Sequence, residues 1–287
     1  AEPQRSARAA AAGPSATSYG DEDSSLMEDA SSSAGSWALS TIDEELAGQI
    51  CAVRTLAELS GLQLPFPAEL SGSSPAYLGT WMIWMVHRVA LDDPSLKELV
   101  FRGQMGQMPA PEAEPRIAPK LVQALGKNRH LERLAIPATN LCGGEQARLL
   151  ARSLSENGAL RYLNIKLNHL ASEDLKEIFR GLASNAALED FSCGDQLDCE
   201  QVGRDVLESV AECLKTNRRL CKIGIELTDT HWRDQINRGI VRNRDTRIKE
   251  GRMPKTDSRL RRQWEADQAA LRGDALPGRW APGGGGA

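Results

Sequence analysis

The stretch Asn128–Ile136 reads NRHLERLAI, and related stretches recur as NGALRYLNI at 157–165, NAALEDFSC at 185–193 and NRRLCKIGI at 217–225. All four follow the frame N-x-x-L-x-x-L-x-I, with another apolar residue at some of the later positions. From one asparagine to the next the intervals are 29, 28 and 32 residues. A nearly fixed period of this length indicates a solenoid with one strand and one helix in each unit.

The end of each frame has the spacing of a strand. Leu134 and Ile136 are two residues apart, so in an extended segment they project to one face while Ala135 projects to the other. Between the frames the apolar residues change to helical spacings. These residues are Leu149, Leu150, Leu154, Leu175, Ile178, Leu182, Val206, Val210 and Leu214. We therefore predict an α/β fold, a curved leucine-rich-repeat solenoid of about five units with helical caps at both ends.

An all-helical repeat array is the alternative, because paired-helix repeats have similar periods. The frames argue against it, since their L-x-x-L-x-I segments are short and alternate in the manner of a strand. They are also followed by residues typical of loops. These loop residues are Pro137, Asn140, Asn168 and Gly194.

One further unit precedes these four. Asp93–Phe101 fits the frame with aspartate in place of asparagine, and it begins 35 residues before Asn128. The extra length holds residues 103–119, a loop rich in proline and glycine, ahead of a short helix at 121–125. A long loop inside a repeat array is either functional or a tolerated insertion, and the sequence leaves both open.

Two helices are predicted before the repeats. Residues 40–60 begin with a capping-box sequence, Thr41–Glu44, and continue with apolar residues along one face. This face either packs on the next segment as part of a cap or docks as a helix into a groove of a partner protein. Residues 75–90 are apolar on most sides. Their tryptophans and methionines could line a ligand site, but at helical spacing they indicate a buried helix that closes the open end of the array.

A basic helix is predicted after the repeats, over residues 232–249. A nearly matching frame at 243–248 has threonine in place of leucine, so the repeat stops there. We expect the arginines of this helix to point outward and its apolar side to pack on the last repeat. The apolar side comprises Trp232, Ile236, Ile240 and Val241.

The chain divides into four parts by composition. Residues 1–38 are acidic and of low complexity, and we expect them to be disordered because they hold few large apolar side chains. Residues 39–74 form a helix with a linker, and 75–252 form the repeat domain with its closing helix. Residues 253–287 are expected to be mostly disordered and end in a glycine-rich tail. The acidity of the first part argues against a transit peptide.

Composition argues against several classes of protein. The chain of 287 residues is 26% charged and 41% hydrophobic, and it has no apolar run of the roughly 18 residues that a membrane span needs. None of its six cysteines form a C-x-x-C pair, which argues against a zinc site or a disulfide framework and favours a reducing, cytoplasmic compartment.

Catalysis and nucleic-acid binding are also disfavoured. The four histidines lie in different units with no nucleophile or acid at a telling spacing, and no phosphate-binding glycine loop follows a strand. We therefore predict no enzyme and no cofactor, metal or small-molecule site. Residues 231–272 carry twelve Lys or Arg against six acids, a net charge of +6. Because the whole chain has net charge −4 and the aromatic residues are scattered, this basic stretch does not indicate a nucleic-acid partner.

Three features, taken in order, resemble one family. They are RVALDDPSLKE at 88–98, the spaced N-x-x-L-x-x-L-x-I frames, and a closing helix with RNRD at 242–245. From Trp81 to Arg252 the chain resembles the C-terminal leucine-rich-repeat domain of tropomodulin and leiomodin. The order of these parts is more specific than the frames alone, which other leucine-rich repeats share.

The resemblance implies a cytoskeletal, cytoplasmic, non-enzymatic protein that binds actin and caps the pointed ends of its filaments. In that family the repeat domain and its last helix contact actin. The matching positions on the closing helix are Arg233, Arg238, Arg242, Arg244 and Lys249. Those on the strand surface are Arg133, Tyr162, Asn164, Lys166, Asp190, Lys222 and Glu226. Actin is acidic, so a basic helix suits it, chiefly by raising the association rate. The alternative for this helix is the solvated face of a cap.

The resemblance does not extend to the long N-terminal half of that family, which carries tropomyosin-binding helices. Residues 1–60 hold no repeated heptad, so tropomyosin-dependent capping is not expected, and the 40–60 helix is the candidate for a second actin contact. The alternative function is a leucine-rich-repeat scaffold that binds another protein through its concave strand positions.

Overall fold

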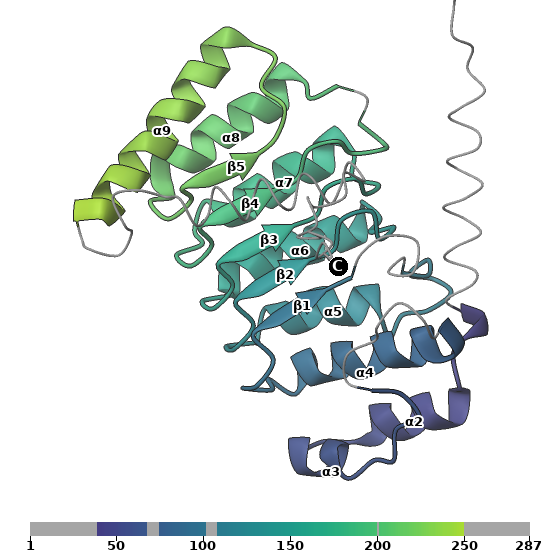
Figure 1. Ribbon diagram of the computed structural model, residues 1–287. Coiled ribbons are helices and arrows are strands. Elements are labelled where there is room, and N and C mark those ends of the chain that lie inside the picture. Colours follow the sequence, from purple (N-terminus) through teal and green to yellow (C-terminus); the bar gives the residue numbers. More distant parts are fainter. Residues whose placement is uncertain (1–38, 68–74, 102–107, 200, 250–287) are drawn as a thin grey trace, which may run out of the picture.

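A five-stranded parallel sheet is the centre of the computed structural model, which describes residues 39–67, 75–101, 108–199 and 201–249. The strand order is β1-β2-β3-β4-β5, so each strand pairs with the next one along the chain. Helices alternate with the strands and lie side by side along one side of the sheet in a curved array (Figure 1). The α/β leucine-rich-repeat solenoid predicted from the sequence is confirmed.

The described elements have the following bounds. The strands are β1 (Glu98–Val100), β2 (Arg133–Ala135), β3 (Tyr162–Asn164), β4 (Asp190–Ser192) and β5 (Lys222–Gly224). The helices are α2 (Glu44–Ala52), α3 (Leu56–Ser60), the 3-10 helix η1 (Pro75–Tyr77), α4 (Leu78–Ala90), α5 (Ala118–Leu125), α6 (Glu145–Glu156), α7 (Ser172–Leu182), α8 (Arg204–Thr216) and α9 (Thr230–Lys249).

The strands pair in one continuous register, which places equivalent frame residues side by side. The middle residue of each strand faces the helices, and Leu134 and Leu163 are fully buried there. Ala135 projects to the opposite face as predicted, yet it is only 2% exposed, because it is small and lies between Val100 and Asn164 of the neighbouring strands. The apolar helix residues predicted between the frames are buried, except for Leu149, which is partly exposed.

The frame asparagines form a hydrogen-bonded ladder along one edge of the solenoid. In each unit the side-chain oxygen accepts backbone N–H bonds from the turn that follows, as Asn157 Oδ1 does from Ala159 and Leu160 at 2.9 and 2.7 Å. The amide nitrogen of Asn157 donates backward to Leu125 O and Asn128 O at 2.5 and 3.1 Å. Buried backbone carbonyls need donors, so the ladder explains why the frame begins with asparagine. Asn185 and Asn217 repeat this pattern.

Arginine side chains close the ladder at both ends. In the first unit Asp93 has no amide to donate, and it accepts instead from Arg88 Nε at 2.7 Å and from the Ser95 backbone at 2.8 Å. In the last unit Asn243 donates to Asn217 O and Leu220 O at 3.0 and 2.8 Å, and its own Oδ1 accepts from Arg242 Nη2 at 2.9 Å. Asn243 lies within α9 and not before a strand, so the final partial frame ends the array as predicted.

The N-terminal cap differs from its prediction in two respects. The expected single helix over 40–60 is interrupted at residues 53–55, giving α2 and α3. The expected capping box is wrong, because Asp43 caps α2 by accepting from the Leu46 N–H, while Thr41 Oγ1 accepts from Gly79 N–H at the start of α4. In return, Thr80 Oγ1 accepts from the Asp43 N–H at 2.8 Å. Sequence spacing cannot reveal this exchange of caps between two helices.

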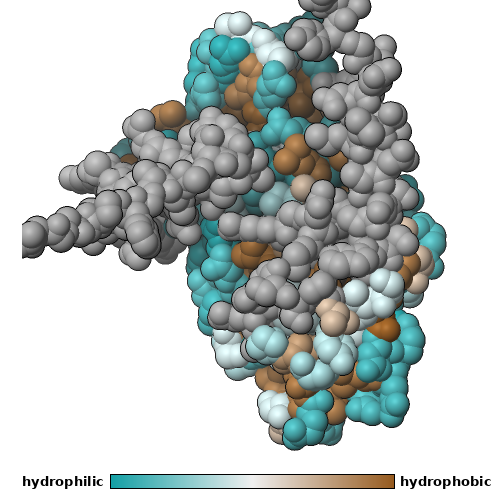
Figure 2. Space-filling view, turned by 45° about the vertical axis from the view of Figure 1, so that its right-hand side comes forward, coloured by the Kyte–Doolittle hydropathy of each residue, from teal (hydrophilic) through white to brown (hydrophobic). Residues whose placement is uncertain are grey.

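The apolar face of α2 is covered by the chain itself. Leu46, Ala47 and Ile50 are buried where α2 packs on α4, so the cap interpretation holds for this face and the partner-groove alternative does not. Helix α4 is confirmed as a core element, with Met82, Trp84 and Met85 buried and Trp81 partly buried. Figure 2 shows some apolar surface at this end, and Leu62 and Leu64 are only partly buried.

The predicted 103–119 loop is irregular over its described part, and α5 begins at Ala118, before the predicted start at 121. Two residues anchor it, since Met108 and Ile117 are fully buried. Arg116 joins it to the cap by bonding Glu114 and both carboxylate oxygens of Glu44 in α2, at 2.6 to 2.9 Å. Residues 108–117 therefore tie α2 to the first repeat.

Helix α9 packs on the last repeat, but not through all of the predicted residues. Ile236 is fully buried and Trp232 and Ile240 are partly buried, whereas Val241 is 52% exposed. At about 100° per residue, Val241 lies about 140° around the helix from Ile236, which turns it away from α8. The predictions for residues 1–38, 68–74 and 250–287 concern residues outside the described part of the chain.

Candidate functional site on the closing helix

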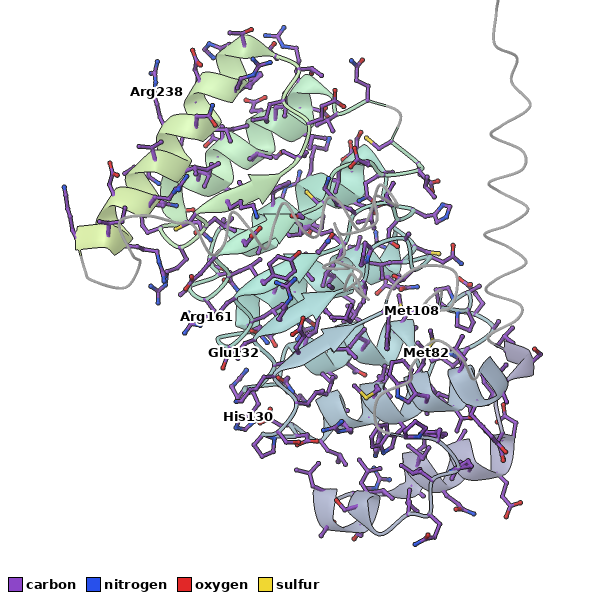
Figure 3. The ribbon with its side chains drawn as sticks, viewed as in Figure 1. Met82, Met108, His130, Glu132, Arg161 and Arg238 are labelled. Carbon is purple, nitrogen blue, oxygen red and sulfur yellow. The ribbon has the colours of Figure 1, made fainter. Side chains whose placement is uncertain are left out.

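The outward face of α9 carries most of the predicted basic residues. Arg233, Arg238, Arg244 and Lys249 are exposed, and Arg238 points away from the sheet (Figure 3). The Arg233 side chain extends toward the residues before α9 and donates from Nη2 and Nε to Leu227 O at 2.8 and 3.2 Å. Within the described residues, Arg238 has neither an ion pair nor a hydrogen bond. Its charge is therefore available to a partner.

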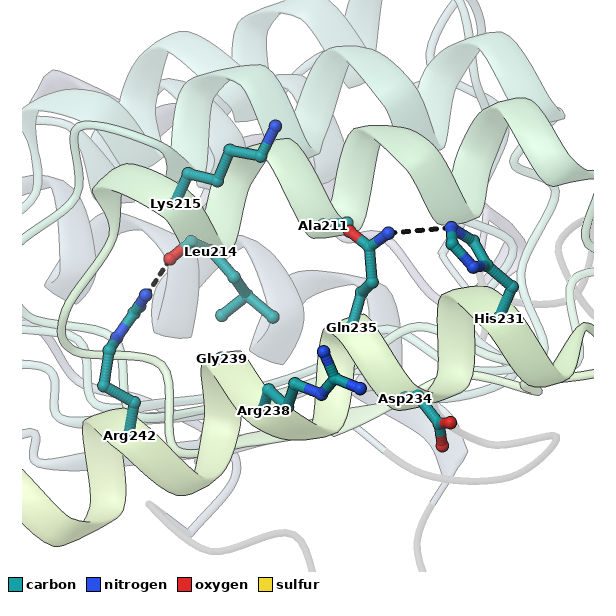
Figure 4. Close-up of a pocket in the computed structure, with 9 residues that line it drawn as sticks. All are labelled: Ala211, Leu214, Lys215, His231, Asp234, Gln235, Arg238, Gly239 and Arg242. Atoms are coloured by element: carbon teal, nitrogen blue, oxygen red, sulfur yellow. Dashed lines mark hydrogen bonds between the residues drawn. The ribbon is translucent and has the colours of Figure 1, made fainter.

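Arg242 is mainly structural, although it was predicted as a partner contact. Its Nη2 donates to Leu214 O at 2.5 Å and to Asn217 O at 3.4 Å, which caps the C-terminal end of α8 (Figure 4). Its guanidinium also donates to Asn243 Oδ1, so it completes the ladder. Burial and then the nearby charge of Arg218 lower the pKa of Arg242. Arg238 and Arg242 thus have different roles, although they are one turn apart.

A groove separates α8 from α9. It encloses a cavity of about 390 Å³, lined on the α9 side by His231, Asp234 and Arg238 (Figure 4). The helices approach closely at Gly239, where an added Cβ would lie 3.0 Å from the Leu214 side chain. Glycine fits this close approach, because a larger residue would force the Leu214 side chain or the helices to shift by a few tenths of an ångström. The groove has basic and acidic residues on its rim, which is typical of a protein contact and not of a small-molecule site.

The predicted residues of the strand surface form an internally neutralised row. Arg133, Tyr162, Asp190 and Lys222 occupy equivalent positions on adjacent strands. Arg133 bonds Glu98 at 2.8 Å and stacks on the Tyr162 ring at 3.7 Å from its centroid. Lys222 pairs with Asp190 at 2.8 Å. These contacts satisfy the charges within the sheet, so the row presents much less net charge than α9 does.

The remaining three strand-surface residues lie near the other end of the strands. Asn164 is 6% exposed and its Oδ1 accepts from the Lys166 N–H at 3.1 Å. Lys166 itself pairs with Asp195 at 2.8 Å. Glu226 follows β5 and is exposed. The predicted residues therefore fall into two groups, one on the sheet and one on α9.

Sequence reasoning missed Arg247. This side chain is 7% exposed, and its Nη2 bonds Glu189 Oε1 at 2.7 Å. Arg161 bonds the same oxygen at 2.8 Å, so two guanidinium groups from different elements meet one carboxylate. Arg247 lies four residues after Asn243, on the side of α9 that faces the repeats. That helical spacing was the available signal.

The described residues show no arrangement for catalysis or metal binding. His130 and His169 each lie 3.0 Å from an aspartate, but no group of three or more His, Cys, Asp or Glu residues is placed to hold a metal within the described ranges. Burial raises the pKa of the Cys213 thiol to about 12 and that of Cys221 to about 11, which makes them poor nucleophiles. Cys193 is fully buried at the last apolar position of its frame. No helix among the described residues has the length and apolar character to cross a bilayer.

Comparison with known protein families identifies the family of this chain. Residues 80–246 match the family model described as the TMOD/LMOD leucine-rich domain. The chain belongs to this tropomodulin and leiomodin family. The resemblance read from RVALDDPSLKE and the repeated frames is therefore confirmed. The match lies within the predicted 75–252 domain, whose bounds stay a prediction.

Two solved structures of this family are similar to the chain. One is titled leiomodin-1 actin-binding site 2, with a TM-score of 0.52 and 23% identity, covering 63% of this chain and 95% of the other. The second is the tropomodulin C-terminal domain of Caenorhabditis elegans, with a TM-score of 0.49 and 22% identity, covering 57% of this chain and 95% of that one. At this identity the first structure supports the fold. No curated protein sequence matches the chain significantly.

Proposed function

We propose that this chain is a cytoskeletal protein that binds actin through its leucine-rich-repeat domain and caps filament pointed ends. Family membership supports actin as the partner, since one similar domain is titled an actin-binding site. The observation that carries the proposal for this chain is the exposed, uncompensated Arg238 on the outward face of α9. A basic helix speeds encounter with an acidic partner, and an exposed arginine is a frequent anchor of a protein interface.

Helix α9 is a better candidate for the contact than the strand surface. The strand row already pairs Arg133 with Glu98 and Lys222 with Asp190. Breaking such pairs on binding costs energy that a new partner must replace. On α9 the exposed Val241 lies beside Arg238, which combines apolar area with charge. We expect the protein to act by binding alone, in the cytoplasm and without tropomyosin.

The test is depolymerisation of actin filaments whose fast-growing ends are blocked. The chain is expected to slow subunit loss at the pointed ends, and Arg238→Glu is expected to remove most of this effect. Lys127→Glu is the matched control, because Lys127 is also exposed, has no ion pair among the described residues and follows α5, which α6, α7 and α8 separate from α9. Arg242 is left unchanged, since its capping bond to α8 would confuse binding with stability.

Two outcomes would contradict the proposal. If subunit loss is unchanged at micromolar concentrations of folded protein, pointed-end capping is wrong for this chain. If capping occurs but Arg238→Glu and Lys127→Glu behave alike, the contact does not depend on α9. The alternative function, a repeat scaffold for another protein, would then be tested with Lys222→Ala on the strand surface.

A further inference from the structure

A second cavity opens beside the C-terminal half of α9. It has a volume of about 360 Å³ and lies where the ends of α7 and α8 meet the last turns of α9. Arginine is the only charged residue type among its described lining residues. The arginines are Arg218, Arg219 and Arg247, and the rest of the lining is small or uncharged.

The charge of Arg247 is only partly compensated. Its described ion-pair partner is Glu189 Oε1, and Arg161 also bonds that oxygen. Two positive charges therefore share one negative charge. Arg247 Nε and Nη1 are buried without a hydrogen-bond acceptor. A buried guanidinium in this condition favours any anion that approaches, because desolvated donors and charges are costly to leave unmatched.

The rim of the cavity adds to this positive charge. Arg218 is exposed. Burial of Arg242 is the main cause that lowers the pKa of Arg242, and the positive charge of Arg218 is the second. Arg219 is half-buried and is oriented by a 2.7 Å bond from its Nε to Ala186 O. Like charges placed this close repel one another, and an anion between them relieves the repulsion.

The helix ends at this site do not counteract the arginines. The C-terminal end of a helix normally repels anions, because its last carbonyl groups are unsatisfied. Here those carbonyl groups already have donors. Asn217 binds Leu182 O, Arg242 binds Leu214 O, and Thr216 Oγ1 binds Ala183 O at 3.2 Å.

We propose that this arginine pocket, formed by Arg218, Arg219 and Arg247, binds a carboxylate side chain of an acidic segment in a partner protein. Arg218 and Arg219 contact the carboxylate, and Arg247 supplies charge from behind. The small cavity suits a single side chain, and the net charge of −4 on the whole chain opposes an extended polyanion such as nucleic acid. The site is separate from Arg238, and its binding does not require that the partner be actin.

The test uses the full chain and a fluorescein-labelled peptide of alternating aspartate and serine, with binding followed by fluorescence anisotropy at low salt. We expect saturable binding that Arg218→Ala weakens about fivefold or more. Arg218→Lys is expected to restore part of the affinity. The matched control is Lys215→Ala, which removes one exposed positive charge from α8 outside this cavity. A shift of the Arg247 side-chain Nε–H resonance in NMR on adding peptide is the independent readout.

Three results would overturn the inference. Absence of saturable peptide binding would do so directly. Equal weakening by Arg218→Ala and Lys215→Ala would show diffuse attraction and not a pocket. Binding of inorganic phosphate that depends on Arg218, with no binding of the peptide, would replace the protein segment with a small anion. Each result is obtained without actin, so it can be distinguished from failure of the capping proposal.

Discussion

The two caps of the solenoid close it by different means. Ten of the thirteen residues of α4 are buried, whereas four of the twenty residues of α9 are. Helix α4 is therefore an element of the core, enclosed between α2 and α5. Helix α9 is attached along one narrow side, which combines Ile236 with the polar residues Asn243 and Arg247. The difference indicates that the N-terminal cap serves stability, while the C-terminal cap leaves most of its surface exposed, as the proposed actin contact requires.

The largest expected effect tests the apolar cap. Ile83 in α4 is fully buried, so Ile83→Ala should lower the free energy of unfolding by about 2–5 kcal/mol, measured by urea denaturation. Ile236→Ala in α9 removes the same atoms from an equally buried site. We expect a smaller loss there, because a terminal helix attached along one side can adjust around the cavity. Equal losses would mean that α9 depends on its apolar contact as much as α4 does.

The next effect tests the polar attachment of α9. Asn243→Ala removes the donors to Asn217 O and Leu220 O, and should cost about 1–3 kcal/mol. Hydrogen exchange should become faster in α9 and remain unchanged in α4. Asn237→Ala is the control, since Asn237 is exposed on the same helix. Slow exchange in α9 of the Asn243 variant would show that the ladder does not hold this cap.

A smaller effect separates structure from binding within α9. Arg242→Ala should lower stability by about 1 kcal/mol, because it removes the cap of α8. Arg238→Ala should change stability by less than about 0.5 kcal/mol. For actin binding the order should reverse, with Arg238→Ala the more harmful change in a sedimentation assay. The division of roles between these two residues fails if one variant is worse in both measurements.

The smallest expected effect is a pH dependence confined to the N-terminal cap. His87 is buried, with Nε2 3.1 Å from Val53 O and Nδ1 2.8 Å from Lys120 Nζ. Burial, then the charges of Lys120 and Arg54, lower its pKa from the ordinary 6.5, although the bond to Val53 O acts in the opposite direction. Just below pH 6.5, His87 is therefore neutral in the folded protein but takes up a proton in the unfolded chain.

The sign of the effect follows from this difference. The contribution of His87 to the free energy of unfolding is complete above pH 6.5. It is lost as the pH falls below 6.5, by at most about 1.4 kcal/mol per pH unit. Urea midpoints at pH 7.5 and 5.5 measure it. His87→Gln should reduce the decline, and His231→Gln on the exposed start of α9 should not. An unchanged decline in His87→Gln would assign the decline to another group and contradict this prediction.

Periodicity predicted the repeat array because the apolar positions of the frame are the positions that are buried in the structure. Leu134 and Ile136 recur in every unit since each strand must present apolar residues to the helices. The same argument located α4, in which nearly every side is buried. The role of the frame asparagine was not predicted, because its bonds reach carbonyl groups 28 to 39 residues earlier in the sequence.

The site was less predictable because one helix carries two roles. Arg242 and Arg238 are both basic and close in sequence, and only the position of Leu214 O shows that the first is a structural cap. Val241 was assigned to the wrong side, since a polar helix with few apolar residues does not define its buried side clearly. Thr41 had the sequence of a cap, but its hydroxyl serves α4 instead of its own helix.

The asparagine ladder also determines where this protein tolerates changes in length. Its rungs fix the short turn between each helix and the strand that follows, because every asparagine bonds both to that turn and to the preceding unit. On the opposite edge, between strand and helix, the turn after β2 is held in a similar way, because Asn168 bonds Ile136 O and the N–H groups of Thr139 and Leu141. The connection after β1 is longer, with 17 residues between β1 and α5 against 9 between β2 and α6, while β1 keeps the common register. The connection after β1 is thus the place where this solenoid accepts added length, so tags and grafted loops belong there and not in the turns that precede the strands.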